Sequence, residues 1–480
     1  MGSFLFDYLS FYSGVIQWIS INFKGNSMNI LIAGAGKVGK TIANELSDEG
    51  HDITIIDSNS KVLEEAISKY DVIGVVGNSA SKDVLEEANV QNMDIFIAAT
   101  SADEVNLLST ITAHSLNENI HTIARIRNPE YAKQAYDMRD VFSLSLVVNP
   151  EKQTAMEIAR LLKYPGFLKR ETFAKARVEI VELKVLEDSI LNNVKLMHLQ
   201  NTVNARVLVC AVTRNGESYI PDGNFVLEKG DRIYVTGETQ QLHTMLTNIG
   251  IITMPVKHAI ITGGGKITYY LAEELHRSNI ATSIIEYDEE LCETLASKLP
   301  FATVIRGDVS DRAVLDGEEI DGYDAFVSLT GMDELNIVTS LYAHTNGVPQ
   351  VVTKLGRGEA PDLIGNMPIG SVVCPKELCT MHIVRYVRAI QNSKGAALTI
   401  HRIAEGNVEA IEFEVDKDTK HINEPLKNTK TKDNVLIVSI RHGTKVSIGG
   451  GDATYDVGDS VIVVAQKNAA IHTLNDIFEE

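Results

Sequence analysis

The sequence predicts an α/β protein made of two tandem copies of a parallel-sheet domain, each followed by a small β-rich α+β domain. Three observations favour this fold class: a long internal repeat, an alternation of apolar runs with helical patterns inside each copy, and a change to short strands after each copy. With 480 residues the chain is too long for one hydrophobic core, and about three or four folded units are expected.

The internal repeat is long and nearly free of insertions. Residues 29–57, "NILIAGAGKVGKTIANELSDEGHDITIID", align with residues 258–286, "HAIITGGGKITYYLAEELHRSNIATSIIE", at an offset of 229. Residues 77–106 align with residues 307–336 at an offset of 230. Two matching stretches with one residue of drift between them indicate that a whole domain is duplicated.

Each copy alternates between strand and helix patterns. Short apolar runs such as "ITIID", "VIGVV" and "IFIAA" are separated by helical patterns such as "KVLEEAISKY" and "EVNLLSTITAHSL". This alternation predicts parallel strands joined by crossover helices, which is a Rossmann-like unit. Pro150 and Pro375 then each introduce an amphipathic helix, as proline is tolerated in a first helical turn.

Short strands and turns follow each of these two helices. Examples are "VEIVELKV" and "ARVLVCAVTRNGE" in the first half, "NVLIVSIRHGT" and "YDVGDSVIVVA" in the second, with Gly-Asp turns at 230–231 and 458–459. The chain is therefore expected to contain an N-terminal extension (1–27), a Rossmann-like domain (28–150), a crossover helix and linker (151–170), a small domain (171–250), a second Rossmann-like domain (256–374), a second crossover helix and linker (375–394) and a second small domain (395–480).

The composition excludes several classes of function. Apolar residues make up 44% of the chain and charged residues 22%, as in ordinary folded proteins. A formal net charge of −20 would repel phosphates, so no nucleic acid partner is expected. The four cysteines form neither a disulfide framework nor a metal set, and buried thiols in a reducing compartment are expected, notably for Cys374 and Cys379.

The first 27 residues differ from the rest of the chain. "FLFDYLSFYSGVIQWISI" has apolar residues at helical spacing, but Asp7 interrupts it and its length is borderline for a membrane span. The segment lacks the cationic start of a secretory signal. A tag, leader or start-site extension before Met28 and an amphipathic helix that meets a membrane or a partner are both open.

"ILIAGAGKVG" (30–39) is typical of a dinucleotide site. Gly34 permits a tight turn, Gly36 lets the backbone approach a phosphate, and Gly39 allows close packing of helix on strand. The helix N-terminus then offers N–H donors to that phosphate. Asp57, at the end of the next strand, can accept hydrogen bonds from an adenosine ribose and would repel the 2′-phosphate of NADP. An empty Rossmann unit is the alternative.

The second copy departs from this pattern at one position. It keeps Gly263, Gly265 and Glu286, but Thr268 replaces the third glycine. A β-branched side chain there is expected to push the helix away from the sheet, which weakens the prediction of a ligand at the second site.

Polar and cationic residues recur at matching strand ends. Thr100 and Thr330 follow strands in "TSADEVN" and "TGMDELN", and Ser101 with Glu104 fits a helix capping box. Capping alone and a place beside the ligand crevice are both compatible with these residues.

Arg125 aligns with Lys354 at an offset of 229, and Lys37 and Lys266 lie inside the two glycine loops. These cations can serve phosphates, and solvated surface charge is the alternative.

The sequence contains no recognisable catalytic arrangement. No tyrosine is followed by lysine four positions later, and no H-E-x-x-H or G-x-S-x-G motif occurs. The small domain is also duplicated, whereas a dehydrogenase would need a separate substrate domain. A sensor is therefore expected, with an NAD-dependent oxidoreductase as the alternative.

The segments "MNILIAGAGKVG", "ITIID" and "ARIRNPEY", with the helix at Pro150, resemble the TrkA family of potassium-uptake regulators, which are built from tandem RCK (KTN) domains. The resemblance covers residues 28 to about 480. It implies a non-enzymatic cytoplasmic subunit, peripheral on the inner face of the membrane, that docks on a Trk-type potassium channel, binds NAD(H), ATP or ADP, and assembles into a homotetrameric ring. Regulation of another cation transporter, such as an efflux channel or antiporter, stays open.

The resemblance also implies two nucleotide sites, without catalytic residues or metal ligands, that act allosterically. The first site would use Gly34, Ala35, Gly36, Lys37, Val38, Gly39, Asp57, Asn78, Thr100, Ser101 and Arg125. The second site would use Gly263, Gly264, Gly265, Lys266, Ile267, Glu286, Asp308, Thr330 and Lys354.

Overall fold

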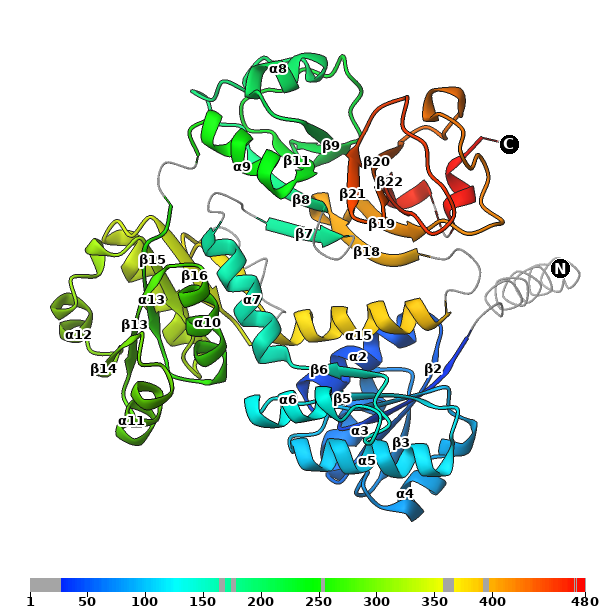
Figure 1. The fold of residues 1–480 in the computed structure, drawn as a ribbon, viewed down its shortest axis with the longest axis vertical. Coiled ribbons are helices and arrows are strands. Elements are labelled where there is room, and N and C mark those ends of the chain that lie inside the picture. The colour runs from blue at the N-terminus through cyan, green and yellow to red at the C-terminus, as the bar shows by residue number, and fades with distance from the viewer. Residues whose placement is uncertain are drawn as a thin grey trace, which may run out of the picture. The chain divides into compact units, whose positions relative to one another are not determined.

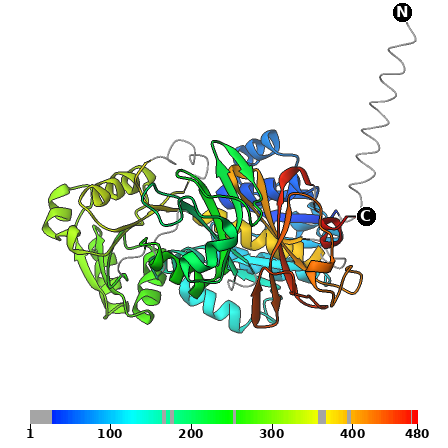
Figure 2. The ribbon, with the colours of Figure 1, turned by 90° about the horizontal axis from the view of Figure 1, so that it is seen from above.

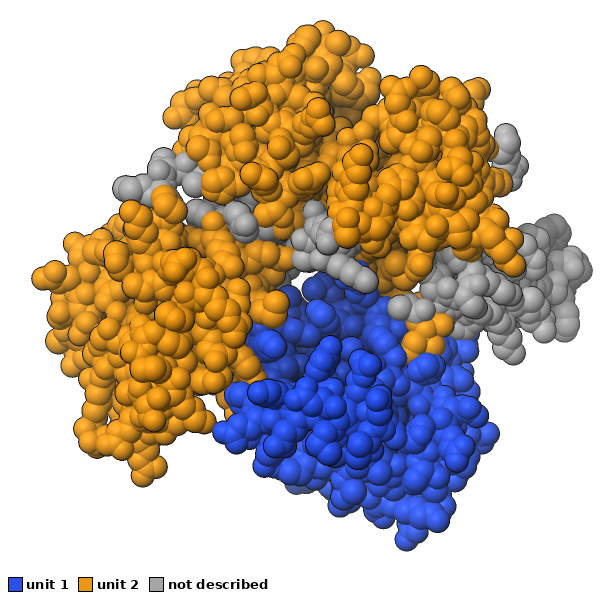
Figure 3. All heavy atoms as spheres, in the orientation of Figure 1, with its two compact units in different colours: residues 1–153, 375–387 blue, residues 154–374, 388–480 orange. Residues whose placement is uncertain are grey.

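The structure, a computed structural model, divides into two compact units. The first comprises residues 1–153 and 375–387, and the second comprises residues 154–374 and 388–480 (Figure 3). The expectation for residues 1–27 lies outside the described residues except for Ser27. The described residues are 27–163, 169–173, 178–251, 255–356, 367–391, 397–469, 471 and 473–479.

The first unit contains a six-stranded parallel sheet with the strand order β3-β2-β1-β4-β5-β6 (Figure 1). The order reverses between β1 and β4, which is the switch point where ligands bind in such sheets. The strands are β1 (Asn29–Ala33), β2 (Asp52–Asp57), β3 (Ile73–Val76), β4 (Ile95–Ala98), β5 (His121–Arg125) and β6 (Leu146–Val148). The helices between them are α2 (Lys37–Asp48), α3 (Ser60–Lys69), α4 (Lys82–Glu87), α5 (Asp103–Leu116) and α6 (Pro129–Asp137).

Both faces of this sheet are buried, which explains the continuous apolar runs in the sequence. Leu31 and Ala33 of β1 pack with Phe96 of β4 and with Leu85 of α4 in one core cluster. Ile32, which points to the opposite face, is also fully buried. Parallel strands covered on both sides favour such runs over alternation of apolar and polar residues.

The second unit contains a sheet of the same design, with the order β14-β13-β12-β15-β16-β17. Its strands are β12 (His258–Thr262), β13 (Ala281–Glu286), β14 (Thr303–Arg306), β15 (Ala325–Ser328), β16 (Gln350–Lys354) and β17 (Ser371–Val373). Its helices are α10 (Lys266–Arg277), α11 (Glu289–Lys298), α12 (Arg312–Gly317) and α13 (Asp333–Thr345).

The two helices introduced by proline are α7 (Pro150–Lys163) and α15 (Pro375–Gln391). From residue 154 onward α7 belongs to the second unit, where the Leu161 carbonyl accepts a hydrogen bond from the Gln350 side chain at 2.7 Å. Residues 375–387 of α15 belong to the first unit. Each crossover helix therefore packs mainly with the Rossmann-like domain of the other repeat.

Two five-stranded antiparallel sheets form the small domains, with the orders β10-β9-β11-β8-β7 and β21-β20-β22-β19-β18. Read in chain order, the two topologies are the same. The strands are β7 (Lys169–Phe173), β8 (Val178–Lys184), β9 (Val207–Arg214), β10 (Glu217–Tyr219), β11 (Arg232–Glu238), β18 (Ala397–Ile403), β19 (Val408–Glu414), β20 (Val435–His442), β21 (Lys445–Ile448) and β22 (Ser460–Gln466).

The two Gly-Asp turns match in conformation. Gly230 and Gly458 have φ of +91° and +88°, which glycine adopts without strain. The carboxylates of Asp231 and Asp459 accept backbone N–H groups inside their turns, from Glu228 at 2.8 Å and Asp456 at 2.6 Å.

The two parallel sheets and the two antiparallel sheets confirm the fold class predicted from the sequence.

The two small-domain sheets lie side by side within the second unit (Figures 1 and 2). One apolar core joins them. Its members include Phe173, Ile180 and Tyr234 from the first sheet, with Ala410 and Ile462 from the second. The first small domain adds helices α8 (Leu199–Val203) and α9 (Thr239–Asn248). The described part of the second has short 3-10 turns instead, η4 (Ala404–Gly406), η5 (Leu426–Asn428), η6 (Lys467–Ala469) and η7 (Leu474–Ile477).

None of the four cysteines, all of which lie in the described part of the chain, is in a disulfide. Cys210, Cys374 and Cys379 are buried and Cys292 is partly exposed, which confirms the prediction for Cys374 and Cys379.

Candidate functional site

The glycine loop of the first repeat is a turn that only glycine fits at two positions. Gly34 has φ of +103°, and a Cβ atom there would lie 3.0 Å from the Ala99 carbonyl oxygen. A Cβ atom on Gly39 would lie 1.8 Å from the Gly34 carbonyl oxygen. A Cβ atom on Gly36 would meet nothing within 4 Å, so the backbone of the exposed Gly36 and Lys37 faces open space at the start of α2. This leaves room for a phosphate at the helix N-terminus.

Asp57 links this loop to the end of β2. Its carboxylate accepts hydrogen bonds from the backbone N–H groups of Ala35 at 2.7 Å and Asn59 at 2.8 Å. A carboxylate has about four acceptor sites, so capacity for ribose hydroxyls is left. The buried Val38 lies in the first turn of α2 behind the loop.

The ends of β4 and β5 are held together by Asn106, a residue that the sequence analysis missed. Asn106 is fully buried, and its side-chain oxygen accepts hydrogen bonds from the Thr100 backbone N–H at 2.9 Å and hydroxyl at 2.6 Å. Its amide donates to the Arg125 carbonyl at 2.8 Å. The available signal was the asparagine shared by "TSADEVN" and "TGMDELN", since a polar residue at matching interior positions of two helices calls for a partner.

The predicted capping box of Ser101 and Glu104 is wrong. Helix α5 begins at Asp103, its N-cap is Ala102, and no side chain caps it. Glu104 instead accepts a hydrogen bond from Tyr131, which raises the pKa of that phenol. The carbonyl of the exposed Ser101 accepts a hydrogen bond from the Arg127 guanidinium.

The predicted cations differ in their surroundings. Arg125 is partly exposed, and its buried Nε has no hydrogen-bond partner among the described residues. Lys354, its counterpart, donates to the Thr330 carbonyl at 2.6 Å. Lys37 and Lys266 are exposed, as solvated surface charges would be.

Asn78 and Asp308 are exposed and cap the loops after β3 and β14. Their side chains accept the backbone N–H groups of Ala80 at 3.0 Å and Ser310 at 2.8 Å. The bond from Ser310 lowers the pKa of Asp308 below its ordinary value.

The second glycine loop keeps the turn but contains a buried side chain. Gly263 has φ of +94°, and α10 begins at Lys266, next to the partly exposed Ile267. Thr268 is fully buried and donates its hydroxyl to the Gly263 carbonyl. A Cβ atom at the matching Gly39 has no space in the first turn, so the two turns differ in their packing at this position. The displacement of α10 from the sheet stays a prediction.

Backbone N–H groups surround the carboxylate of Glu286. Glu286 is only 6% exposed and accepts N–H groups from Gly264 at 2.5 Å, Tyr287 at 2.8 Å and Asp288 at 2.9 Å. A Cβ atom on Gly264 would lie 3.0 Å from the Glu286 Cγ and 2.6 Å from the Leu295 Cδ1. Gly264 therefore makes room for an acid that is one methylene longer than Asp57, while Gly265 has open space around it.

Among the described residues, no group of three or more His, Cys, Asp or Glu residues is arranged to hold a metal ion. Within the same part of the chain, no helix combines the length and the apolar character needed to cross a membrane.

Comparison with known proteins identifies both halves of the chain. The TrkA-N domain family matches residues 30–150 and 259–375, and the TrkA-C domain family matches residues 180–250. The Trk system potassium uptake protein TrkA homolog of Archaeoglobus fulgidus is 30% identical over 452 residues, which cover 94% of this chain and 100% of that protein. The TrkA protein of Vibrio alginolyticus is 29% identical and covers 94% of this chain and 99% of its own.

Solved structures show the same fold. The GsuK channel superposes with a TM-score of 0.61 at 16% identity, covering 93% of this chain and 78% of the channel chain. The GsuK RCK domain superposes with a TM-score of 0.59 at 17% identity, covering 93% of this chain and 94% of that one. With full-length relatives and both Rossmann-like domains matched, the chain belongs to the TrkA family of Trk system potassium uptake proteins.

Proposed function

We propose that this protein is a nucleotide-sensing regulatory subunit that controls a Trk-type membrane potassium channel and has no catalytic activity of its own. The observation that carries the proposal is repeated in both halves: a carboxylate at the end of the second strand accepts an N–H group of an open glycine loop. Asp57 does so for Ala35, and Glu286 does so for Gly264. The relatives are named as potassium uptake proteins, which favours regulation over oxidoreductase chemistry.

The proposed ligands are NAD(H), ATP and ADP, which share an adenosine and a diphosphate. The residues proposed to contact them are those predicted from the sequence, with Asp57 and Glu286 at the ribose and the glycine loops at the phosphates. The GsuK channel bound to NAD is one of the solved structures with this fold, at a TM-score of 0.58 and 16% identity.

The proposed mechanism is allosteric and acts through the crossover helices. Arg125 lies at the far end of the first crevice, near Cys379 on α15. Burial raises the pKa of the Cys379 thiol to about 12, and the positive charge of Arg125 opposes that rise. Helix α15 leads to β18 of the second small domain. A ligand that alters the β5 end therefore acts on a helix that continues into another domain. A coupling of about 1–3 kcal/mol per site is typical of such systems.

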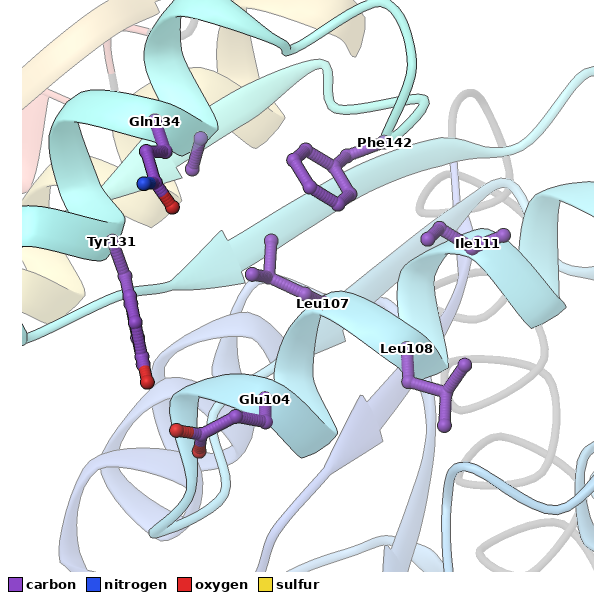
Figure 4. A pocket seen from close by; sticks show the side chains of 8 residues that line it. Glu104, Leu107, Leu108, Ile111, Tyr131, Gln134 and Phe142 are labelled. Carbon is purple, nitrogen blue, oxygen red and sulfur yellow. The ribbon is translucent and has the colours of Figure 1, made fainter.

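The proposed assembly is a homotetrameric ring that lies on the cytoplasmic face of the membrane through its channel partner. A groove of about 310 Å³ on the first unit supports self-association, because it is open and mainly apolar (Figure 4). Leu107, Leu108 and Ile111 of α5 line one side and Phe142 the other. Leu108 is 52% exposed, and Val338, its counterpart on α13, is 61% exposed.

The test is calorimetric binding of NAD, NADH, ATP and ADP to the full chain, followed by chromatographic recovery of each ligand. We expect binding to be lost at one site in Asp57→Ala and at the other in Glu286→Ala, with every ligand recovered unchanged. The matched control is Asp52→Ala, at the opposite end of β2 from Asp57. Conversion of a ligand would contradict the regulatory assignment, and absence of binding would contradict the sensor.

A further inference from the structure

A buried asparagine occupies the same place in both repeats and makes the same bonds. Asn106 and Asn336 are both 0% exposed. The Asn336 side-chain oxygen accepts from the Thr330 backbone N–H at 2.9 Å and hydroxyl at 2.7 Å, and its amide donates to the Lys354 carbonyl at 3.0 Å. These distances match those of Asn106 with Thr100 and Arg125 within 0.2 Å.

Each asparagine joins two neighbouring strand ends at the carboxyl edge of its sheet. Thr100 follows β4 and Arg125 ends β5, while the asparagine itself lies on α5, the helix between these strands. The Asn106 oxygen accepts at the β4 end, while its amide donates to the Arg125 carbonyl at 2.8 Å and to the Thr100 carbonyl at 3.4 Å, so neither end can shift without breaking a buried hydrogen bond. Unsatisfied buried polar groups are costly, which fixes the spacing of the two ends.

These strand ends form one half of the crevice. In a sheet of this order a dinucleotide lies across the switch point, with its adenosine on the β1 and β2 side and its second nucleoside on the β4 side. The glycine loop and Asp57 belong to the first half, and Thr100 and Arg125 belong to the second. A nucleoside diphosphate needs mainly the first half, whereas a dinucleotide needs both.

The two repeats differ in the residues of the first half, whereas the asparagine and the groups that it bonds agree in the second half. Gly39 and Asp57 become Thr268 and Glu286, yet the asparagine and its partners keep their geometry. The half of the crevice at the ends of the fourth and fifth strands is therefore built alike in both repeats, although the phosphate loop of the second repeat differs from that of the first.

We propose that Asn106 and Asn336 are positioning residues that hold the second half of each crevice and favour a dinucleotide over a nucleoside diphosphate. The inference rests on the proposed nucleotide function and adds the residue that sets the ligand class. The carboxamide is required because its two ends must accept and donate at once.

The test compares NAD and ADP affinities of the full chain with those of Asn106→Asp and Asn106→Ser. Aspartate keeps the acceptor for Thr100 but turns an oxygen toward the Arg125 carbonyl, and serine is too short to reach either partner. We expect the ratio of the NAD to the ADP dissociation constant at the first site to rise about tenfold in both variants, as the loss of one or two buried hydrogen bonds implies. Asn336→Ser should raise the same ratio at the second site. This variant provides the test if the Asn106 variants do not fold.

The matched control is Asn117→Asp, at the C-terminal end of the same helix. Asn117 donates to the carbonyls of Val90 at 3.1 Å and Met93 at 2.9 Å, so it also joins backbone segments, but at the opposite edge of the sheet. This variant should lower thermal stability and leave the NAD to ADP ratio unchanged. Equal losses for both ligands in the Asn106 variants would overturn the inference alone, whereas a wild-type chain that binds neither ligand would overturn the proposed function as well.

Discussion

Single residues at the two glycine loops compensate each other in size. The hydrogen bond from loop N–H to carboxylate exists in both repeats, from Ala35 to Asp57 and from Gly264 to Glu286. The larger acid is combined with the smaller loop residue, and Leu295 fills space that a Cβ atom on Gly264 would enter. The two pairs are therefore not interchangeable one residue at a time.

Gly264→Ala is expected to destabilise the second Rossmann-like domain by about 1–3 kcal/mol, the usual cost of overpacking. The new Cβ atom would lie 2.6 Å from the Leu295 Cδ1. Chemical denaturation of the full chain measures the change. Gly265→Ala is the control, since its Cβ atom meets nothing within 4 Å. Adding Glu286→Asp to Gly264→Ala should restore part of the loss, and a double variant no more stable than the single one would refute size compensation.

The cysteines are expected to differ in reactivity. Burial raises the pKa of Cys210 and of Cys379 to about 12, so both thiols stay neutral and covered in the folded protein at pH 8. Cys292 also has a raised pKa, caused first by burial, but it is partly exposed. Alkylation followed by mass spectrometry should modify Cys292 first and Cys210 only after unfolding. Equal rates for the two would show that the core around Cys210 is not closed.

At this scale the sequence predicts backbone roles better than side-chain partners. The positions of Gly34 and Gly39 follow from the strand and helix on either side of the motif, and the structure shows why a Cβ atom fails there. The partners of Asn106 lie 6 and 19 residues away on different strand ends, so only the fold reveals them. The capping box failed because α5 begins at Asp103.

At the scale of elements, the strand order and the crossover helices organise the chain. The sequence predicts the parallel strands, the helices and the duplicated antiparallel sheets, because each has its own apolar periodicity. The sequence does not predict which Rossmann-like domain each crossover helix packs against, because both Rossmann-like sheets offer similar apolar faces. The core shared by the two small-domain sheets also requires the structure, since its residues come from two distant segments, 173–234 and 403–464.

Phe173→Ala is expected to destabilise this shared core by about 3–5 kcal/mol, as for other buried aromatic residues. Phe173 is fully buried, and its ring lies 4.7 Å from that of His401 in an edge-to-face arrangement. Chemical denaturation measures the change, with Tyr136→Ala as control because Tyr136 is 67% exposed. Equal effects of the two substitutions would mean that the sheets do not share a core.

At the scale of the whole molecule, each of the two compact units contains one candidate nucleotide site. The seven segments expected from the sequence stay a prediction. The two compact units divide after residues 153, 374 and 387, and the first and last of these positions lie within the crossover helices. Two sites in one chain and several chains in a ring would multiply a modest coupling at each site into a large change at the channel.

Leu108→Glu is expected to weaken self-association at least tenfold, because it puts a charge into the apolar groove between α5 and α6. Light scattering across a concentration series measures the assembly. Ile73→Glu, on the edge strand β3, is the control, because Ile73 is 68% exposed and lies outside the groove. Nucleotide affinity should be unchanged in both variants. An unaltered assembly in Leu108→Glu would place the interface elsewhere.

The most direct test of nucleotide control is potassium flux through liposomes that contain the Trk-type channel subunit of the same cell and this protein. We predict that NAD(H), ATP or ADP changes the flux with the wild-type chain. Asp57→Ala combined with Glu286→Ala should abolish that response while the protein still binds the channel. A response that persists in the double variant would contradict nucleotide control through these two sites.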